Sequence, residues 1–548
     1  IDNFDLSYQA DYSKSRYRNP LGTRGRFRER DELVFYSATD EGVIINATPD
    51  TDDYSRKKSG VDTSDASKFA FDNILIDDVT AVDKIYSARL DGKWNIEIND
   101  RAAYIKTGVK FRSRKKFTDK EQLDGNPADV GFGGITMADV GTYDPENTNL
   151  NNFVLIPNLA ASQALFNDAR DALLANGGFN VDSASDDFKI TEKILAGYIM
   201  AHVELSDEFS IIAGARLERT SLDSDGTITE TLRTCDDALC TTLTSTPVGI
   251  GALTQNKQYT DILPSLHFKY QPNDEVIMRL ALTKAVKRPA FDENRPNIGI
   301  STTEQEDGSY LRALVGGNPN LETLRANQID FLVSWYPNDN LAISAGIFYK
   351  DIKNFIVDVA LSGDAVAQSG YPIGDGSIDA GFDSVLTFIN GEKASLLGFE
   401  LSYYQAFDAI PGVFVDGNVT WVDSKSKIPL IDPDRTFKLP DQPSFVGNFS
   451  IGYENEHVTF RLSGNYVGEK LETVASDTAM DEIRQSRFSM DFGARYNFNK
   501  QFQIYFDAIN LNNAKDVRVF RNGANAPRLF ERVEDYGRTF QLGVRASF

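Results

Sequence analysis

The residue types best suited to covalent or metal chemistry are scarce in this chain. Among its 548 residues there are 2 cysteines and 3 histidines. Cys235 and Cys240 lie close together in Thr234-Cys-Asp-Asp-Ala-Leu-Cys-Thr241, with no histidine beside them. This spacing favours a disulfide at a loop tip over a metal site, and a disulfide implies an oxidising compartment. We therefore predict no catalytic residues, no cofactor and no metal; the acidic loops also lack the EF-hand spacing of a calcium site.

The charge of the chain argues against a second class of function. Its formal net charge is -23, from 57 Lys and Arg against 80 Asp and Glu. A nucleic-acid partner is disfavoured, because no basic excess exists to meet phosphates. Acidic runs such as residues 49–53 and 431–435 indicate solvated loops.

Most of the chain alternates between apolar and polar residues with the period of a β-strand. Ile262, Leu266 and Phe268 share one face of a predicted strand, and the polar residues between them share the other. Pairs of such segments are joined by polar turns, as hairpins require. The turns lie at residues 206–208, 271–274, 337–340, 408–412, 454–457 and 499–501. A soluble β-sandwich and a membrane barrel both fit this pattern.

Two features favour the membrane barrel. The apolar face ends in an aromatic residue beside most short turns, at Tyr270, Trp335, Phe407, Tyr453 and Phe498, as in the girdle at a membrane interface. Short connections also alternate with long ones, and outer-membrane barrels show the same alternation of short periplasmic turns and long extracellular loops. Mean hydropathy is -0.34 and no apolar run approaches the ~18 residues of a membrane helix, a test that does not apply to strands.

The last segment alternates in the same way and ends on an aromatic residue. It resembles the closing strand of a bacterial outer-membrane β-barrel, whose terminal Phe is part of the signal read by the barrel-assembly machinery. The face that would carry this signal consists of Tyr536, Phe540, Leu542, Val544 and Phe548, with Arg538 as the one charged intruder.

The predicted fold is therefore all-β, a transmembrane antiparallel β-barrel with about sixteen strands in this chain. A helix is expected over residues 161–176, inside a long loop, with Leu165, Ala169 and Leu173 on one face. The strands are expected near residues 3–15, 83–92, 102–116, 191–205, 210–221, 258–270, 275–286, 326–336, 341–354, 394–407, 413–423, 444–453, 458–469, 486–498, 501–511 and 532–548.

Several stretches resemble TonB-dependent receptors, which import scarce nutrients through a plugged barrel. The first is Gly316-Gly-Asn-Pro-Asn-Leu-Glu-Thr-Leu-Arg325, followed by Phe348-Tyr-Lys-Asp-Ile-Lys-Asn-Phe355. Glu322 stands where the family often has Lys, and Thr323-Leu324 replaces the usual Pro-Glu. The segments 263–268, 283–291 and 390–400 extend the ordered set, which looks most like a proteobacterial subgroup linked to carbohydrate uptake.

The resemblance implies parts that are not visible here. The family barrel has about twenty-two strands around a plug, and a short box before the plug binds TonB. The chain opens on Ile1-Asp-Asn-Phe-Asp-Leu-Ser-Tyr8, without a signal peptide. We therefore expect residues 1–548 to be the later part of the barrel. The N-terminal plug and the first strands are expected to be missing or to lie on another chain.

The implied function is TonB-dependent import of a scarce nutrient across the bacterial outer membrane, with a carbohydrate or a siderophore as the candidate nutrients. The implied partners are TonB, acting through the absent plug, the missing N-terminal segment, outer-membrane lipid and the barrel-assembly machinery. A surface or periplasmic binding protein is a further candidate partner. A passive porin is the alternative, and a soluble carbohydrate-binding β-protein is a second one.

The resemblance also points to candidate site residues. Ligand contacts are expected from one long polar loop, with Arg288, Glu293, Arg295, Tyr310 and Asn318 as candidates. Polar residues of the strands are expected to face the lumen, where they pack against the plug or pair with one another; these are His267, Arg279, Asp330, Arg461, Asp491 and Arg495.

Overall fold

The computed structural model describes residues 3–28, 32–39, 42–49, 66–143, 155–176, 186–235, 243–362, 382–475, 478–521 and 528–547. Within these residues, sixteen strands form one antiparallel meander in chain order, which confirms the predicted fold class and strand count. They are β1 (Phe4–Arg28), β4 (Ala70–Ile98), β5 (Arg101–Gly125), β8 (Phe188–Glu204), β9 (Phe209–Cys235), β10 (Leu243–Tyr270), β11 (Val276–Lys287), β14 (Leu324–Asn338), β15 (Leu341–Lys353), β18 (Lys393–Ala406), β19 (Val413–Lys427), β20 (Phe445–Glu454), β21 (Val458–Val467), β24 (Arg487–Asn497), β25 (Phe502–Ile509) and β28 (Thr539–Ala546).

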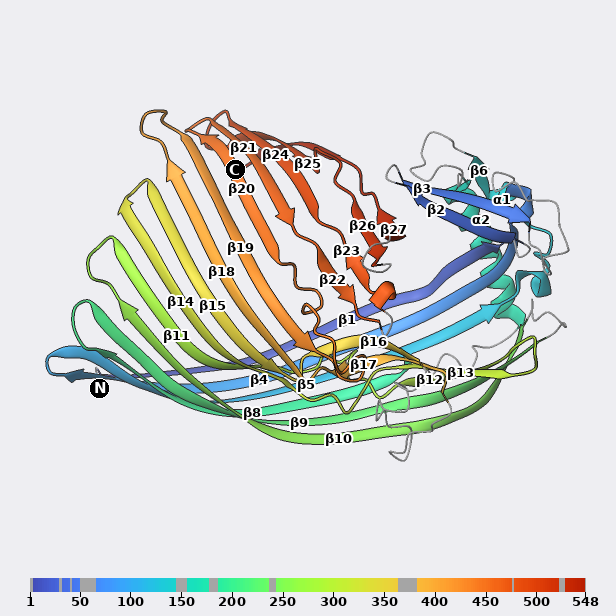
Figure 1. The fold of residues 1–548 in the computed structure, drawn as a ribbon, viewed down its shortest axis with the longest axis horizontal. Coiled ribbons are helices and arrows are strands. Elements are labelled where there is room, and N and C mark those ends of the chain that lie inside the picture. The colour runs from blue at the N-terminus through green and yellow to red at the C-terminus, as the bar shows by residue number, and fades with distance from the viewer. Residues whose placement is uncertain are drawn as a thin grey trace.

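The meander forms a strongly curved, open sheet (Figure 1). The described pairings join β1 to β4 and β25 to β28, and none of them joins β1 to β28. All six predicted turns join neighbouring strands at one edge of this sheet. A further tight turn joins β4 to β5, where Asn99 and Asp100 have φ values of 51° and 60°. Two successive positive φ values are typical of a type I′ hairpin turn.

Several strands are much longer than expected. β4, β9 and β10 contain 29, 27 and 28 residues, against the ~10 needed to cross a bilayer. The far ends of β9 and β10 carry polar residues on both faces, so the apolar alternation fades there although backbone pairing continues. The predicted strand 532–548 is also corrected, because Gly537, with φ 67°, separates β27 (Leu529–Glu534) from β28.

The long loops carry strands that the alternation did not predict. β12 (Ile298–Glu304), β13 (Tyr310–Gly316), β16 (Ile356–Ser362) and β17 (Ser384–Asn390) pair with one another and with the extended part of β9. A separate four-stranded sheet, here the loop sheet, consists of β22 (Lys470–Thr473), β23 (Glu482–Arg484), β26 (Asp516–Phe520) and β27.

One apolar cluster joins these loops to the ends of the barrel strands. It includes Ile298 of β12, Val359 of β16, Ile483 of β23 and Val519 of β26, each less than 5 % exposed. Leu396 of β18 and Val422 of β19 belong to the same cluster. This loop-side core therefore fixes several loops as one body on the side opposite the short turns.

The predicted helix is confirmed as α2 (Leu159–Asn176). Ala169 and Leu173 are buried against Phe71, Ile74 and Leu123 of β4 and β5, and Leu165 packs against the same cluster. Smaller elements nearby are β2 (Glu32–Thr39), β3 (Gly42–Pro49), α1 (Met137–Val140), β6 (Gly141–Tyr143) and β7 (Leu155–Pro157). Helices of the 3-10 type span Ala66–Lys68, Pro127–Val130 and Thr478–Met480. In the described ranges, no helix is both long and apolar enough to cross a membrane.

The two faces of the large sheet differ in chemistry. The outer face exposes large apolar side chains, such as Leu195, Phe331, Ile347, Phe399 and Trp421. The inner face carries polar and charged residues at the intervening positions. On the outer face of β28, Phe540, Leu542 and Val544 are 61–75 % exposed. Tyr536, before the break at Gly537, is 69 % exposed, and Phe548 lies outside the described residues.

Candidate functional site

The inner face of β5 carries a row of basic residues. Side chains alternate along a strand, so even-numbered residues of β5 share the face opposite to the exposed Val109 and Phe111. The even positions hold Lys106, Lys110, Arg112, Arg114, Lys116 and Lys120. A chain with a net charge of -23 thus concentrates six cations on one face of one strand.

The part of this row nearest the loops is neutralised by acids from three different segments. Arg114 pairs with Asp83 of β4 at 2.5 Å, and Lys116 pairs with Asp292 at 2.7 Å. Lys120 pairs with Asp186 at 2.8 Å. These contacts hold loop segments against the inner face.

The part nearer the short turns is not neutralised. Lys110 and Arg112 are half-buried, and the described residues provide neither with a hydrogen-bonding or ion-pair partner. Lys110 lies directly opposite Arg89 of β4, and Lys106 lies opposite Lys93. We call Arg89, Lys93, Lys106, Lys110 and Arg112 the inner basic cluster.

In the described part of the chain, three carboxylates lie in or beside this cluster, and all three are engaged. Asp5 stands opposite Lys93 and accepts from Asn95, and Asp11 accepts from the Ser87 hydroxyl. Asp91 accepts from Arg89 at 2.5 Å and from the Tyr198 hydroxyl at 2.6 Å, and only 4 % of the residue is exposed. Like charges directly opposite one another destabilise a sheet. The inner basic cluster therefore has the chemistry of a binding surface for an anion.

The alternation of residues along β5 contains a usable signal for this cluster. Basic residues at 106, 110, 112, 114 and 116 keep the parity of one strand face. The net charge of the whole chain concealed this local excess, and the cluster was absent from the predicted site residues.

Most of the predicted ligand-binding residues are held by contacts within the protein. Arg288 pairs with Glu218 of β9 at 2.5 Å and donates to the Thr220 hydroxyl at 3.1 Å. Arg295 pairs with Asp186 at 2.8 Å. These residues anchor the segment 288–297 across the inner face, where Phe291 packs against Phe188, Ile190 and Leu222.

The structure brings Glu293 and Asn318 together as well. The Asn318 backbone N–H donates to the Glu293 carbonyl at 2.8 Å, and the Glu293 carboxylate accepts from the Ala290 N–H at 2.6 Å. The Asn318 side chain donates to the Phe388 carbonyl at 2.9 Å. Tyr310 is instead 50 % exposed at the far end of β13, about 20 Å along the strand from Gly316.

The predicted lumen-facing residues all lie on the inner face. Arg461 pairs with Asp416 at 2.9 Å and Arg495 with Asp507 at 3.2 Å. Asp491 accepts from the Asn510 N–H at 2.8 Å. His267 and Asp330 both stand opposite Ala281 of β11, and Arg279 stands opposite Lys269.

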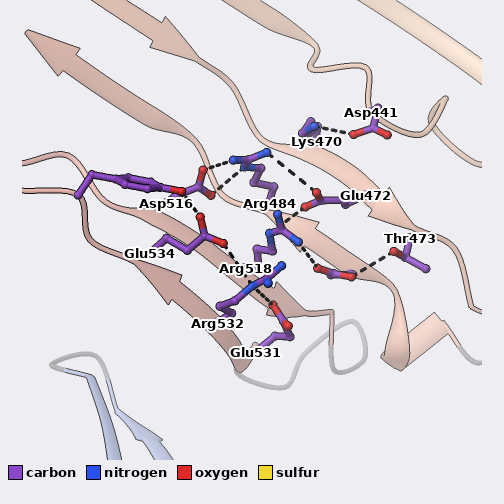
Figure 2. Close-up of polar contacts among 12 residues, drawn as sticks. Asp441, Lys470, Glu472, Thr473, Arg484, Asp516, Arg518, Glu531, Arg532 and Glu534 are labelled. Carbon is purple, nitrogen blue, oxygen red and sulfur yellow. Dashed lines mark hydrogen bonds and ion pairs between the residues drawn. The ribbon is translucent and has the colours of Figure 1, made fainter. Parts of the chain in front are cut away.

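A second charged group lies in the loop sheet (Figure 2). Arg484 pairs with Asp516 through two contacts, of which Nε to Oδ1 measures 2.7 Å. Arg518 contacts Glu472 and Glu482 at 3.3 and 3.4 Å. Each of these arginines has an acidic partner, so this group stabilises the loop sheet and does not offer a free charge to a ligand.

Two predictions concern metal and sulfur chemistry. Within the described residues, no group of three or more His, Cys, Asp or Glu side chains could hold a metal ion. Cys240 lies outside the described residues, so its disulfide with Cys235 stays a prediction.

Comparisons with known proteins agree with this architecture. A family model described as "TonB dependent receptor-like, beta-barrel" matches residues 2–511. No curated protein sequence matches the chain.

The fold is similar to solved receptor structures at low sequence identity. The ferric-catecholate import receptor Fiu of E. coli is 13 % identical with a TM-score of 0.56, and the alignment covers 100 % of this chain and 62 % of Fiu. The siderophore receptor PiuA of Acinetobacter baumannii is 13 % identical with a TM-score of 0.54, covering 100 % and 62 %. The pyoverdine receptor FpvA of Pseudomonas aeruginosa is 12 % identical with a TM-score of 0.53, covering 100 % and 59 %.

The chain thus spans about three-fifths of the length of these receptors. The matched family comprises receptors and transporters, not enzymes. The family model matches most of the residues, and the strand meander agrees with it. This chain therefore belongs to the TonB-dependent receptor family of outer-membrane β-barrels.

Proposed function

We propose that the protein takes part in TonB-dependent import of a scarce anionic nutrient, such as a ferric siderophore, across the outer membrane. The inner face lines the import path, and a plug energised through TonB opens it. Family membership supports the transport class. The observation that carries the anionic ligand is the pair Lys110 and Arg112, which are half-buried cations without a described partner.

The charge of the inner basic cluster favours an anion over a neutral sugar. A hydrogen bond to a charged group contributes about 1.5–3 kcal/mol, roughly twice that of a bond between neutral groups. An uncharged carbohydrate would leave the mutual repulsion of these cations in place. The resemblance to a carbohydrate-uptake subgroup rests on loop motifs alone, and the inner face supports a siderophore better.

Uptake by whole cells tests the proposal. Cells that express this protein are supplied with anionic ferric complexes of catecholates and of citrate, and with uncharged oligosaccharides. We expect gene-dependent uptake of an anionic complex, and K110Q/R112Q should weaken its binding by about 10- to 100-fold per lost contact. R101Q/K500Q also removes one lysine and one arginine, but both lie beside short turns and off the inner face, so this variant should leave uptake unchanged.

The same assay separates the alternatives. Collapse of the proton gradient should stop uptake; continued uptake would favour a passive porin. Import of oligosaccharides alone would overturn the anionic ligand and leave the transport class intact. Equal uptake by K110Q/R112Q and the wild type would remove the inner basic cluster from the import path.

A further inference from the structure

The hairpin of residues 458–497 is interrupted where it leaves the barrel wall. Its two strands pair as β21 and β24 within the wall, as far as Val467 opposite Arg487. Farther along they pair again as β22 and β23 in the loop sheet, where Lys470 stands opposite Arg484. Residues 468–469 and 485–486 separate these two rungs, so the backbone ladder is broken between the wall and the loop sheet.

Two N–H groups at this break bond to strands on either side of the hairpin. The Gly468 N–H donates to the Phe445 carbonyl of β20 at 2.7 Å. The Gln485 N–H donates to the Val517 carbonyl of β26 at 2.9 Å. One side of the break is thus tied to the wall and the other to the loop sheet, so the break can act as a hinge between them.

A polar pocket lies at this hinge, with a volume of ≈ 260 Å³; we call it the hinge pocket. The cations that line it are Lys470, Arg484 and Arg487, and the carboxylates are Asp441 and Asp516. The lining therefore carries an excess of positive charge. Pockets for drug-sized ligands usually measure about 300–1,000 Å³, so the hinge pocket suits a smaller molecule.

Two of these cations are already paired. Lys470 contacts Asp441 at 2.5 Å, and Arg484 donates from Nε to Oδ1 of Asp516 at 2.7 Å (Figure 2). Among the described residues, the half-buried Arg487 guanidinium has no hydrogen-bonding or ion-pair partner. Asp516 lies within its electrostatic reach, but Arg484 holds that carboxylate. The hinge pocket thus keeps one cation for a ligand.

The chemistry of the lining indicates a small organic carboxylate. A guanidinium binds a planar carboxylate through two parallel N–H···O bonds. Pro443 and Val467 supply apolar surface in the same pocket as Arg487. A short hydrocarbon chain or a ring attached to the carboxylate could cover this surface, whereas inorganic phosphate or chloride would leave it bare.

We propose that a free small organic carboxylate binds to Arg487 in the hinge pocket and stiffens the connection between the barrel wall and the loop sheet. Arg487 belongs to the wall, whereas Lys470 and Arg484 belong to the loop sheet. A ligand between them contacts both sides of the broken ladder, and it stabilises the arrangement that it binds by mass action. The site is distinct from the inner basic cluster and does not depend on which nutrient is imported.

Benzoate is the probe for this site, and benzamide is its uncharged counterpart of nearly the same shape. Calorimetric titration of the detergent-solubilised receptor measures binding, and hydrogen exchange of β22 and β23 measures the stiffening. Benzoate should bind to the wild type and slow exchange in both strands, whereas benzamide should do neither. R487Q should weaken benzoate binding by about 10- to 100-fold, and R487K should restore part of it as a point charge.

Variants outside the hinge pocket serve as controls. R532Q removes a 47 % exposed cation from β27 of the same loop sheet and should bind benzoate as the wild type does. K110Q/R112Q should also bind it normally, so this proposal and the proposed import of an anion are tested independently. Without benzoate, R487Q should exchange as the wild type does, because Arg487 has no partner to lose.

Several results would overturn the proposal. Equal binding of benzoate and benzamide would remove the role of charge. Equal benzoate binding by R487Q and R532Q would exclude Arg487 from the site, and faster exchange in ligand-free R487Q would make it a structural residue. Displacement of benzoate by a ferric catecholate complex would assign the pocket to the imported nutrient instead of a separate ligand.

Discussion

Arg484 and Asp516 join β23 to β26 through a two-contact ion pair, with the carboxylate 6 % exposed and the guanidinium 33 % exposed. The pair closes the loop sheet over Ile483 and Val519, which belong to the loop-side core. A polar contact between segments 32 residues apart thus fixes part of an apolar core.

Replacement of Asp516 by Asn should loosen the loop sheet. The variant keeps the shape of the side chain but leaves Arg484 without its carboxylate, a loss of about 1.5–3 kcal/mol before solvent screening reduces it. Hydrogen exchange of β23 and β26 measures the effect. Asp339→Asn, in the short turn between β14 and β15, is the control; equal exchange in both variants would show that the pair is unimportant.

The same pair predicts a dependence on acid. The Arg484 guanidinium holds the pKa of the Asp516 carboxyl below its usual range. A lowered pKa stabilises the folded state above the unfolded value of about 4, and this contribution is lost as the pH falls through the folded pKa. The protection factors of the loop sheet in the wild type, corrected for the intrinsic exchange rate at each pH, should fall below pH ~4. D516N should lack this component, and an identical pH profile would contradict the assignment.

A missing side chain at Gly398 makes room for an aromatic ring. Gly398 of β18 stands opposite Phe348 of β15, and a Cβ added at Gly398 would lie 2.1 Å from the Phe348 ring. Gly398→Ala should therefore cost about 1–3 kcal/mol by overpacking. Gly346→Ala is the control, because its added Cβ would meet its nearest atom at 3.4 Å. Thermal unfolding in detergent compares them, and equal midpoints would count against the ring contact.

Helix α2 should depend on its buried face. Leu173 is 8 % exposed against β4 and β5, whereas Leu159 is 83 % exposed at the start of the helix. Leu173→Ala should destabilise the helix by about 2–5 kcal/mol, and Leu159→Ala should change little. Limited proteolysis of the loop reports the difference. Similar cleavage of the two variants would mean that the helix does not need this packing.

The outer face should tolerate apolar residues and reject charge. Phe399 is 43 % exposed within the apolar belt, and its replacement by Arg should cost about 2–4 kcal/mol near the bilayer midplane. Ser402→Arg places the same charge on the inner face of β18 and should be tolerated. The folded fraction after refolding into lipid vesicles measures both. A soluble sandwich would give the reverse order, since its apolar face would be the core.

The strand pattern was predictable where the two faces meet different surroundings. Ile262 and Phe268 alternate with polar neighbours because one face of β10 is apolar and the other is polar. On the N-terminal side of Asp261, β10 also contains Thr254 and Gln255, where the contrast between an apolar and a polar face disappears. The sequence therefore located β10 but not its full length.

The site was less predictable because its partners lie far away in the chain. Arg288 has the sequence context of an exposed loop residue, but Glu218, 70 residues earlier, holds it. No local pattern reveals such a partner. In contrast, the sequence alone could have placed Lys110 and Arg112 on one face of a strand, because alternate side chains of a strand point to the same face.

The loop-side core has a consequence for how this receptor can diverge. Strands from four different loops contribute to it, including Ile298, Val359, Ile483 and Val519. A change of volume in one loop alters the packing of the others, so substitutions in separate surface loops should accumulate in compensating sets. Exchange of a single loop with a relative should fail more often than exchange of the whole set.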